Sequence, residues 1–288
     1  MPEGHTLHRL AAEITERFAG DVVRFSSPQG RFAAEAKAID GRTLVGAEAW
    51  GKHLLLDVDD ELWVHVHLGI FGRFTFGEPP APRPLGQVRL RMTGPRAWAD
   101  LRGPNACRLL DDGQRDALLA RLGPDPLRDD ADPDRAWARI SRSRTPIATL
   151  LMDQSVIAGA GNIYRAEVLF RHQVDPLLPG RELSPQLWAA IWDDLRYLMR
   201  DGVRVGRIDT VRPEHQPEVA GRAPRVDRHG GEVYVYRRAG QACHVCRTPV
   251  ATRVLAGRNL FWCPTCQPSG APTGSGKPAT ASSHPDPH

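Results

Sequence analysis

The first twenty residues carry apolar side chains at steps of three and four positions, at Leu7, Leu10, Ala11, Ile14 and Phe18. This spacing places the apolar side chains on one face of an α-helix. The sequence therefore predicts an amphipathic helix at the start of the chain, packed on a core.

Short runs typical of β-strands follow, from about residue 21 to residue 111, with Gly, Pro and Asp between them. The clearest runs are 53–60, 61–68 and 87–93, and the proline-rich stretch 77–86 suits a loop between two strands. One helix followed by such runs indicates a β-sandwich or a flattened barrel with a helix ahead of it.

Helical periodicity takes over from about residue 115. We predict helices over 115–123, 132–146, 146–159, 164–174 and 184–202. Asp132 is placed to cap the second of these, while Pro146 and Gly159 suit the first turn and the end of the third. An irregular stretch, 204–231, then leads to a strand-like run at 232–238.

Composition and charge narrow the class of protein. The 288 residues are 41% hydrophobic and 25% charged, which suits a globular chain of roughly two domains. No run of eighteen apolar residues occurs and the N-terminus lacks an apolar signal-peptide core, so we expect a cytoplasmic, nucleoid-associated protein without a membrane partner. The net charge is +4, and residues 196–262 hold thirteen arginines against six acidic residues. This permits a nucleic-acid partner without requiring one.

Four of the five cysteines form two pairs, Cys243 with Cys246 and Cys263 with Cys266, in the pattern C-x2-C-x16-C-x2-C. Two such knuckles at this separation supply four thiolates for one structural zinc ion, and two disulfides are the alternative. We expect residues 232–238 and 259–262 to be the strands of a β-hairpin around this site. Arg258 would then lie at the hairpin tip, where a guanidinium suits a DNA phosphate.

The N-terminus offers a second candidate chemistry. Removal of Met1 would leave Pro2 with a secondary α-amine, and α-amino groups titrate far below lysine. Such an amine is a nucleophile for imine chemistry, with Glu3 beside it as a general acid. Lys52, in a turn ahead of a strand, would supply charge near a phosphate or an opened sugar. Taken alone, each of these residues is as readily explained by ordinary capping and solvation.

The stretch 153–167, with two glycines and Asn162, is the most distinctive string in the chain. Helices that meet at a glycine turn expose unpaired amides and the positive end of a helix dipole to a phosphate. Asn162 would add a side-chain donor. An ordinary capped pair of helices is the alternative.

Together these motifs resemble the formamidopyrimidine-DNA glycosylase/endonuclease VIII family of DNA repair enzymes. The resemblance covers about residues 1–266. It rests on PEG, GKHLLL, HLGIFG, RLGPDPL, MDQSVIAGAGNIYRAE, VYRRAGQAC and GRNLFWCPTCQ.

The resemblance implies a bifunctional DNA glycosylase and AP lyase of base excision repair. Pro2 would form a Schiff base with C1′ of the damaged nucleotide, and Glu3 would protonate the sugar oxygen. Lys52 matches the lysine linked to β-elimination, and Arg258 the zinc-finger arginine linked to δ-elimination. The implied DNA contacts are Asn162, Arg121, and Ile70 and Phe71 as an apolar wedge, although Ile70 and Phe71 also suit a buried position in the sandwich.

Departures from the family pattern indicate the lesion class. Thr6 stands where the family usually has a second acid, the D-x-R-R-F-G loop of the purine-directed branch is replaced by Leu101–Cys107, and 204–231 lacks an oxidised-guanine loop. We therefore expect the endonuclease VIII branch, acting on oxidised pyrimidines in double-stranded DNA. The alternatives are an oxidised-purine glycosylase, a catalytically silent damage-binding paralogue, and a zinc-ribbon regulatory module.

The expected fold is α+β and multidomain. A catalytic β-sandwich domain with its N-terminal helix would span 1–114, a helix-two-turns-helix DNA-binding domain 115–235, and a zinc finger 236–266. Residues 267–288, rich in Pro, Gly and Ser, have a composition typical of a disordered tail. We expect one structural Zn²⁺, no small-molecule cofactor, and a monomer.

Overall fold

The computed structural model describes residues 2–59, 61–227 and 231–270. Its N-terminal half is an antiparallel sheet of eight strands in the order β5-β7-β6-β1-β2-β3-β4-β8. In that order the strands are β5 (Arg73–Gly77), β7 (Trp98–Arg102), β6 (Val88–Thr93), β1 (Val22–Ser26), β2 (Arg42–Trp50), β3 (His53–Val58), β4 (Leu62–His67) and β8 (Ala106–Asp111).

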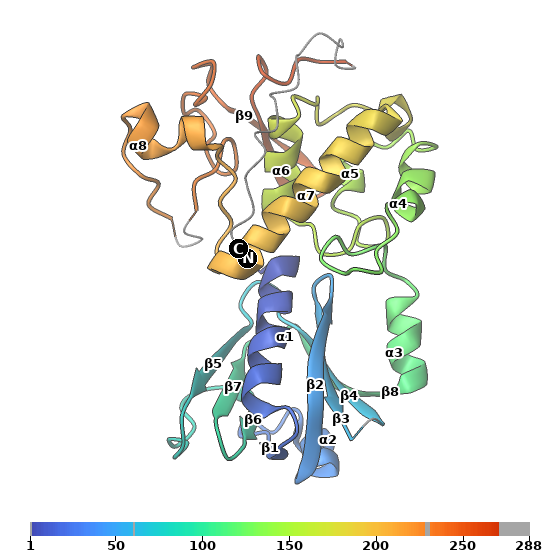
Figure 1. The fold of residues 1–288 in the computed structure, drawn as a ribbon, viewed down its shortest axis with the longest axis vertical. Helices are drawn as coiled ribbons and strands as arrows, with labels where there is room; N and C mark the ends of the chain where they lie inside the picture. Colours follow the sequence, from blue (N-terminus) through green and yellow to red (C-terminus); the bar gives the residue numbers. More distant parts are fainter. Residues whose placement is uncertain (1, 60, 228–230, 271–288) are drawn as a thin grey trace, which may run out of the picture.

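Helix α1 (Gly4–Phe18) lies along this sheet, between the β5-β7-β6 side and the β2-β3-β4 side (Figure 1). Its apolar stripe, including Leu7, Ile14 and Phe18, joins the same buried core as strand residues such as Leu54 and Met92. The predicted amphipathic helix and β-sandwich are confirmed. A short helix, α2 (Ala33–Ile39), was not predicted.

The C-terminal half is mainly helical and lies above the sandwich in Figure 1, except for its first helix, α3, which lies beside the sheet next to β8. Its elements are α3 (Asp112–Leu119), α4 (Pro133–Ile140), α5 (Ile147–Leu150), α6 (Asn162–Arg171), η1 (Gly180–Glu182), α7 (Pro185–Val205), η2 (Pro213–His215), α8 (Pro217–Ala220), β9 (Ala251–Leu255) and β10 (Arg258–Trp262). Asp132 caps α4, as predicted, by accepting a bond from the Asp134 amide.

The helix predicted over 146–159 was wrong beyond its first turn, because α5 ends at Leu150. Polar side chains take over the backbone bonds that a longer helix would need. Asp153 accepts from the Ser155 amide at 2.9 Å, and Gln154 Oε1 accepts from the Gly159 amide at 3.0 Å. Such local side-chain bonds compete with helix formation and stabilise two successive turns instead.

The strand predicted at 232–238 was also wrong. The amides of Tyr234, Val235 and Tyr236 donate to the buried carboxylate of Glu167, at 2.6, 2.9 and 2.8 Å, in place of a partner strand. The zinc-finger hairpin is formed instead by β9 and β10, with Arg258 paired with Leu255 at its tip.

The boundary of the expected tail needs one correction. Gln267 is 2% exposed, because its side chain bonds the Val174 carbonyl and the Cys263 amide. The rest of the expected tail, from residue 271, lies outside the described residues. Within the described part of the chain, no helix is long and apolar enough to span a membrane.

Candidate active site

Three glycines let three distant backbone segments meet at the start of α1. The amide of Gly4 donates to the carbonyl of Gly159 at 2.9 Å. A Cβ added to Gly4 would lie 2.9 Å from Gly159 Cα, and one added to Gly51 would lie 2.9 Å from the Gly159 amide nitrogen. Because real Cβ atoms do not approach backbone so closely, only glycine permits this junction. It brings the N-terminus, the β2–β3 turn and the 151–161 loop together.

Glu3 is completely buried at this junction, where it meets the first turn of α6. Its carboxylate accepts bonds from the amides of Gly161 and Ile163, each at 2.9 Å, and from Tyr164 at 3.4 Å. Burial raises the pKa of Glu3, while Lys52 and the three amides oppose that shift. The expectation that these amides await a phosphate was wrong, because Glu3 already occupies them.

Lys52 lies in the tight turn between β2 and β3, next to Gly51. Its Nζ donates to the carbonyl of Ala160 at 2.8 Å. Burial lowers the pKa of Lys52, and the charge of Arg258 acts in the same direction, whereas Glu3 raises it. A lysine so placed exchanges its proton more readily than an exposed lysine.

The hairpin tip is tied to α6 through Asn162. Asn162 Nδ2 donates to the carbonyl of Asn259 at 3.0 Å, and its Oδ1 accepts from the buried guanidinium of Arg165, which also reaches Asn259. These bonds fix the backbone beside Arg258, whose exposed guanidinium has no partner among the described residues. The hairpin binds the side-chain amide of Asn162 in this structure, which holds no DNA. The contact expected between Asn162 and a DNA phosphate therefore stays a prediction.

A cavity of about 330 Å³ opens at this junction. It is lined by Pro2, Lys52 and Arg258, with Ile70 and Phe71 at its edge. Ile70 is 57% and Phe71 79% exposed, so neither packs inside the sandwich, and their role as an apolar wedge stays a prediction. Five predicted site residues therefore border one cavity.

Sequence reasoning missed several residues that line the same cavity: His67, Asn105, Met152 and Gln154. The signal for His67 was its place directly before the LGIFG string, and for Asn105 its place in the loop that replaces the purine-branch motif. Arg121, in contrast, lies outside this cavity. It borders a separate opening with His65 and Arg108.

The four cysteines form a compact cluster that fits zinc. Their sulfur atoms all lie within 4.8 Å of one another, and no disulfide joins them. Tetrahedral zinc with bonds of about 2.3 Å requires sulfur atoms about 3.8 Å apart. The Sγ atoms of Cys243 and Cys266 are 3.9 Å apart, and those of Cys246 and Cys263 are 3.3 Å apart. The cluster is therefore the ligand set of one structural zinc ion.

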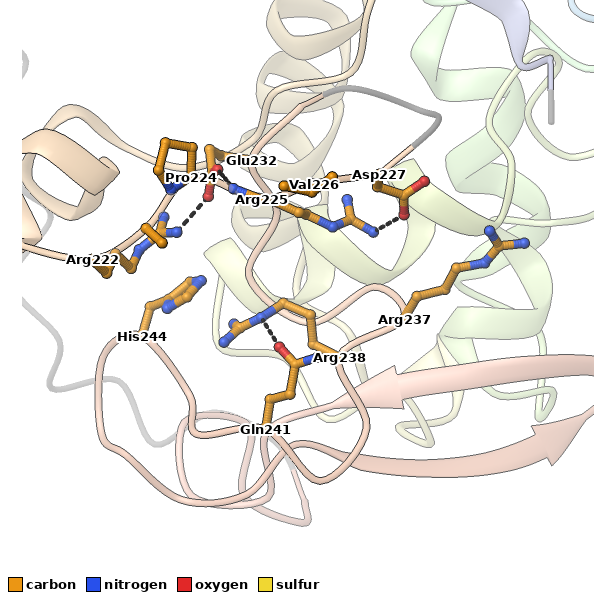
Figure 2. Close-up of a pocket in the computed structure, with 11 residues that line it drawn as sticks. Arg222, Pro224, Arg225, Val226, Asp227, Glu232, Arg237, Arg238, Gln241 and His244 are labelled. Atoms are coloured by element: carbon orange, nitrogen blue, oxygen red, sulfur yellow. Dashed lines mark hydrogen bonds and ion pairs between the residues drawn. The ribbon is translucent and has the colours of Figure 1, made fainter.

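A further pocket of about 360 Å³ is lined by residues 222–227, by Glu232 and by four residues between 237 and 244 (Figure 2). It is lined by four arginines, and carboxylates already pair with two of them. Arg222 contacts Glu232 and Arg225 contacts Asp227, each at 2.6 Å. These pairs reduce the charge that a ligand would meet.

Comparison with known proteins decides the family. Residues 1–107 match the formamidopyrimidine-DNA glycosylase N-terminal domain, 122–213 its H2TH domain, and 240–268 the zinc finger found in FPG and IleRS. Endonuclease 8 1 of Mycobacterium tuberculosis is 54% identical over 271 residues, which cover 93% of this chain and 100% of that protein. The chain belongs to the formamidopyrimidine-DNA glycosylase/endonuclease VIII family.

Members of this glycosylase family also include more distant relatives. The formamidopyrimidine-DNA glycosylase of Thermosynechococcus vestitus is 35% identical over 239 residues, covering 79% of this chain and 81% of that one. Among solved structures, the Lactococcus lactis enzyme bound to AP-site DNA has a TM-score of 0.74 at 22% identity, covering 93% and 100% of the two chains. MutM with DNA containing carbocyclic 8-oxo-G has a TM-score of 0.75 at 21% identity, with the same coverage.

Membership of this family makes the chain a base-excision-repair DNA glycosylase with AP lyase activity. The resemblance drawn from the sequence motifs is confirmed, as are the Fpg-like fold and the zinc finger. The likeness to the two solved structures, each below 25% identity, supports the fold alone.

Proposed function

We propose that this glycosylase excises oxidised pyrimidines from double-stranded chromosomal DNA through an N-terminal proline Schiff base, and then cleaves the strand by β,δ-elimination. The observation that carries the proposal is the convergence of Pro2, Lys52 and Arg258 on one cavity, with buried Glu3 directly behind it. A silent paralogue or a regulatory zinc-ribbon module would have no need for this arrangement.

Pro2 is the nucleophile in this mechanism. After removal of Met1, its nitrogen lone pair attacks C1′, the glycosidic bond breaks, and the base leaves with the bonding electrons and takes up the proton that the amine loses. The bond between C1′ and the ring oxygen then breaks to give an iminium, and the ring oxygen takes a proton from Glu3. Burial raises the pKa of Glu3, which favours the protonated carboxyl that a general acid requires.

The cationic side chains of Lys52 and Arg258 then assist strand cleavage. Lys52, whose pKa burial lowers, assists removal of a C2′ proton, and the 3′ phosphate leaves as the C3′–O bond breaks. Arg258 at the hairpin tip grips the flanking phosphates, and a second elimination releases the 5′ phosphate. The products are phosphate ends on both sides of a gap. Ile70 and Phe71 fill the space that the everted nucleotide leaves in the duplex.

Two observations support oxidised pyrimidines as the lesion class. The 54% identical mycobacterial relative carries the name Endonuclease 8 1. In addition, Leu101–Cys107 lacks the D-x-R-R-F-G loop of the purine-directed branch, and its Asn105 lines the cavity instead. An oxidised-purine glycosylase is the second candidate, favoured by the 35% identical formamidopyrimidine-DNA glycosylase.

Borohydride trapping of the untagged protein tests this proposal. Duplexes carrying an oxidised pyrimidine, 8-oxoguanine or an abasic site are incubated with the wild type, Pro2→Ala and a variant with an N-terminal extension. We expect an adduct on the pyrimidine and abasic duplexes that both changes abolish. Trapping mainly on 8-oxoguanine would move the protein to the purine-directed branch, and absence of any adduct with DNA still bound would establish a silent paralogue.

A further inference from the structure

The backbone carbonyl of Ala160 is the point at which Lys52 is held. Lys52 Nζ donates to this carbonyl at 2.8 Å. On either side of Ala160, the backbone of residues 159–161 is bound to the N-terminal segment, through the amide of Gly4 and the carboxylate of Glu3. The position of Lys52 relative to the N-terminus therefore depends on how firmly the Ala160 carbonyl is held.

The side chain of Gln154 holds this carbonyl from within the same loop. Its Nε2 donates to the Ala160 carbonyl at 2.9 Å and to the Met152 carbonyl at 3.1 Å. Its Oε1 accepts from the Gly159 amide at 3.0 Å. One carboxamide thus binds the backbone of two consecutive residues, and it shares the acceptor of Lys52.

Gln154 lines the catalytic cavity together with Pro2 and Lys52, yet the proposed chemistry makes no use of its side chain. Its amide orientation follows from its neighbours, because the oxygen faces an N–H group and the nitrogen faces two carbonyls. A carboxamide offers hydrogen bonds but is neither an acid nor a base near neutral pH. These contacts therefore favour a role in fixing the loop over a role in proton transfer.

We propose that Gln154 is a positioning residue for strand cleavage, which fixes the Ala160 carbonyl and thereby holds Lys52 in the catalytic cavity. The proposal rests on the proposed function, in which Lys52 assists β-elimination. Without the carboxamide, the Ala160 carbonyl would keep Lys52 as its one donor among the described residues, and the Gly159 amide would lose its acceptor. The bonds to the N-terminal segment do not involve Gln154, so β-elimination should suffer more than imine formation.

Single-turnover kinetics on an abasic duplex separate these two steps. Borohydride trapping at successive times measures imine formation, and the appearance of the cleaved strand measures β-elimination. Gln154→Met keeps the length of the side chain and removes its polar atoms. We expect imine formation within about twofold of the wild type and β-elimination about tenfold slower, because displacement of a catalytic group by about 1 Å costs up to about a hundredfold. Elimination at the wild-type rate, or equal slowing of both steps, would overturn the proposal.

A double-mutant cycle tests whether Gln154 acts through Lys52. Changes to two residues that act through one another are not additive. We expect Lys52→Gln alone to slow β-elimination, and Gln154→Met to slow it by less than about twofold more in that background. A further tenfold loss there would show that Gln154 acts by another route, which contradicts the proposal.

Gln154→Glu gives a readout that a purely structural role would not change. The new carboxylate would lie beside Lys52 Nζ, because both side chains reach the Ala160 carbonyl. The other charged or titratable side chains that interact electrostatically with Lys52 are Glu3, Arg258, His53 and His67. An added negative charge raises the pKa of an amine, and a base must be neutral to accept a proton.

The rate of β-elimination should therefore begin to rise at a pH about one unit higher in Gln154→Glu than in the wild type. Gln154→Met adds no charge, so it should lower the rate without moving the profile. An unmoved profile in Gln154→Glu would show that position 154 does not act on Lys52, and the proposal would fail.

Gln216→Met is the matched control. Gln216 is also half-buried and donates to a backbone carbonyl, that of Val211, at 2.8 Å, but it is not among the residues that line the catalytic cavity. The control should match the wild type in both steps, and a loss equal to that of Gln154→Met would count against the proposal. Thermal melts check that each variant remains folded.

The same assays distinguish failure of this proposal from failure of the proposed function. A wild type that binds the duplex without forming an adduct would refute the Schiff-base mechanism. A Lys52→Gln variant that eliminates at the wild-type rate would refute the role given to Lys52. Normal trapping, slow elimination in Lys52→Gln and wild-type elimination in Gln154→Met would refute positioning by Gln154 alone.

Discussion

Asp125 holds the Lys52 turn against the segment that joins the two halves of the molecule. Its buried carboxylate accepts bonds through Oδ2 from the Gly51 amide at 2.6 Å and from His8 Nε2 at 2.7 Å. Oδ1 accepts from the Leu127 amide at 2.9 Å. In Asp125→Asn one of these oxygens becomes an amino group, which must face an N–H donor.

The magnitude follows from these contacts. The substitution removes at least one bond to a charged acceptor, worth about 1.5–3 kcal/mol, and leaves a buried donor unsatisfied at about 1–3 kcal/mol. Since partial relaxation offsets some of this, we expect the free energy of unfolding to fall by about 2–4 kcal/mol. The Gly51–Lys52 turn also loses its anchor, and displacement of a catalytic group by about 1 Å costs up to about a hundredfold in rate. We therefore expect a single-turnover cleavage rate at least tenfold lower on an abasic duplex.

Urea unfolding and single-turnover cleavage measure the two effects. Asp129→Asn is the matched control, because it makes the same change in the same segment on a side chain that is 95% exposed. The control should match the wild type in both assays. The reasoning is refuted if Asp125→Asn keeps the wild-type unfolding midpoint, or if it loses stability while cleaving at the wild-type rate under folding conditions.

Three further predictions concern stability and metal. In Glu167→Gln, one carboxylate oxygen becomes an NH₂ group that faces hydrogen-bond donors. The free energy of unfolding, measured in urea melts, should therefore fall by about 3 kcal/mol or more. The same change at exposed Glu218 should leave it unaltered. A strong chelator should release one zinc per chain in a colorimetric assay, and Cys246→Ser should prevent its binding; either change should abolish DNA binding. Retention of DNA binding would show that the hairpin holds Arg258 in place without metal. Burial lowers the pKa of His65 to about 4, so the unfolded chain binds a proton that the folded chain does not. The free energy of unfolding should therefore fall by up to about 2 kcal/mol from pH 7 to pH 5 on this account, and a His65→Gln variant with an equally steep loss would contradict it.

Some features depended only on residues close together in the chain, and the sequence alone predicted them. The stripe from Leu7 to Phe18 marks α1, and alternation marks strands such as β3 and β4. The cysteine spacing predicted the zinc site, since each C-x2-C knuckle is a local structure that presents two thiolates. The motifs from PEG to GRNLFWCPTCQ also predicted the family.

Segments far apart in the sequence decided the rest. Residues 232–238 have the composition of a strand, but three of their amides donate to Glu167, which lies 67 to 69 positions earlier in the chain. The amides at the start of α6 look available to a phosphate, yet they are occupied by Glu3, which lies 158 and 160 positions before the two donors in the sequence. The periodicity of the sequence cannot predict such a partner, because the partner depends on which carboxylate packs against these amides in the folded chain.

The sequence by itself determined the helices and strands with regular periodicity, the metal site and the kind of chemistry that the N-terminus offers. Only the tertiary structure decided that Gly4, Gly51 and Gly159 meet, that Ile70 and Phe71 stay exposed, and that Arg121 borders an opening separate from the catalytic cavity. The physical reason is the range of the interactions. Helix and strand patterns arise from neighbours a few residues apart, whereas the cavity exists only where α1, the β2–β3 turn and the 151–161 loop pack together.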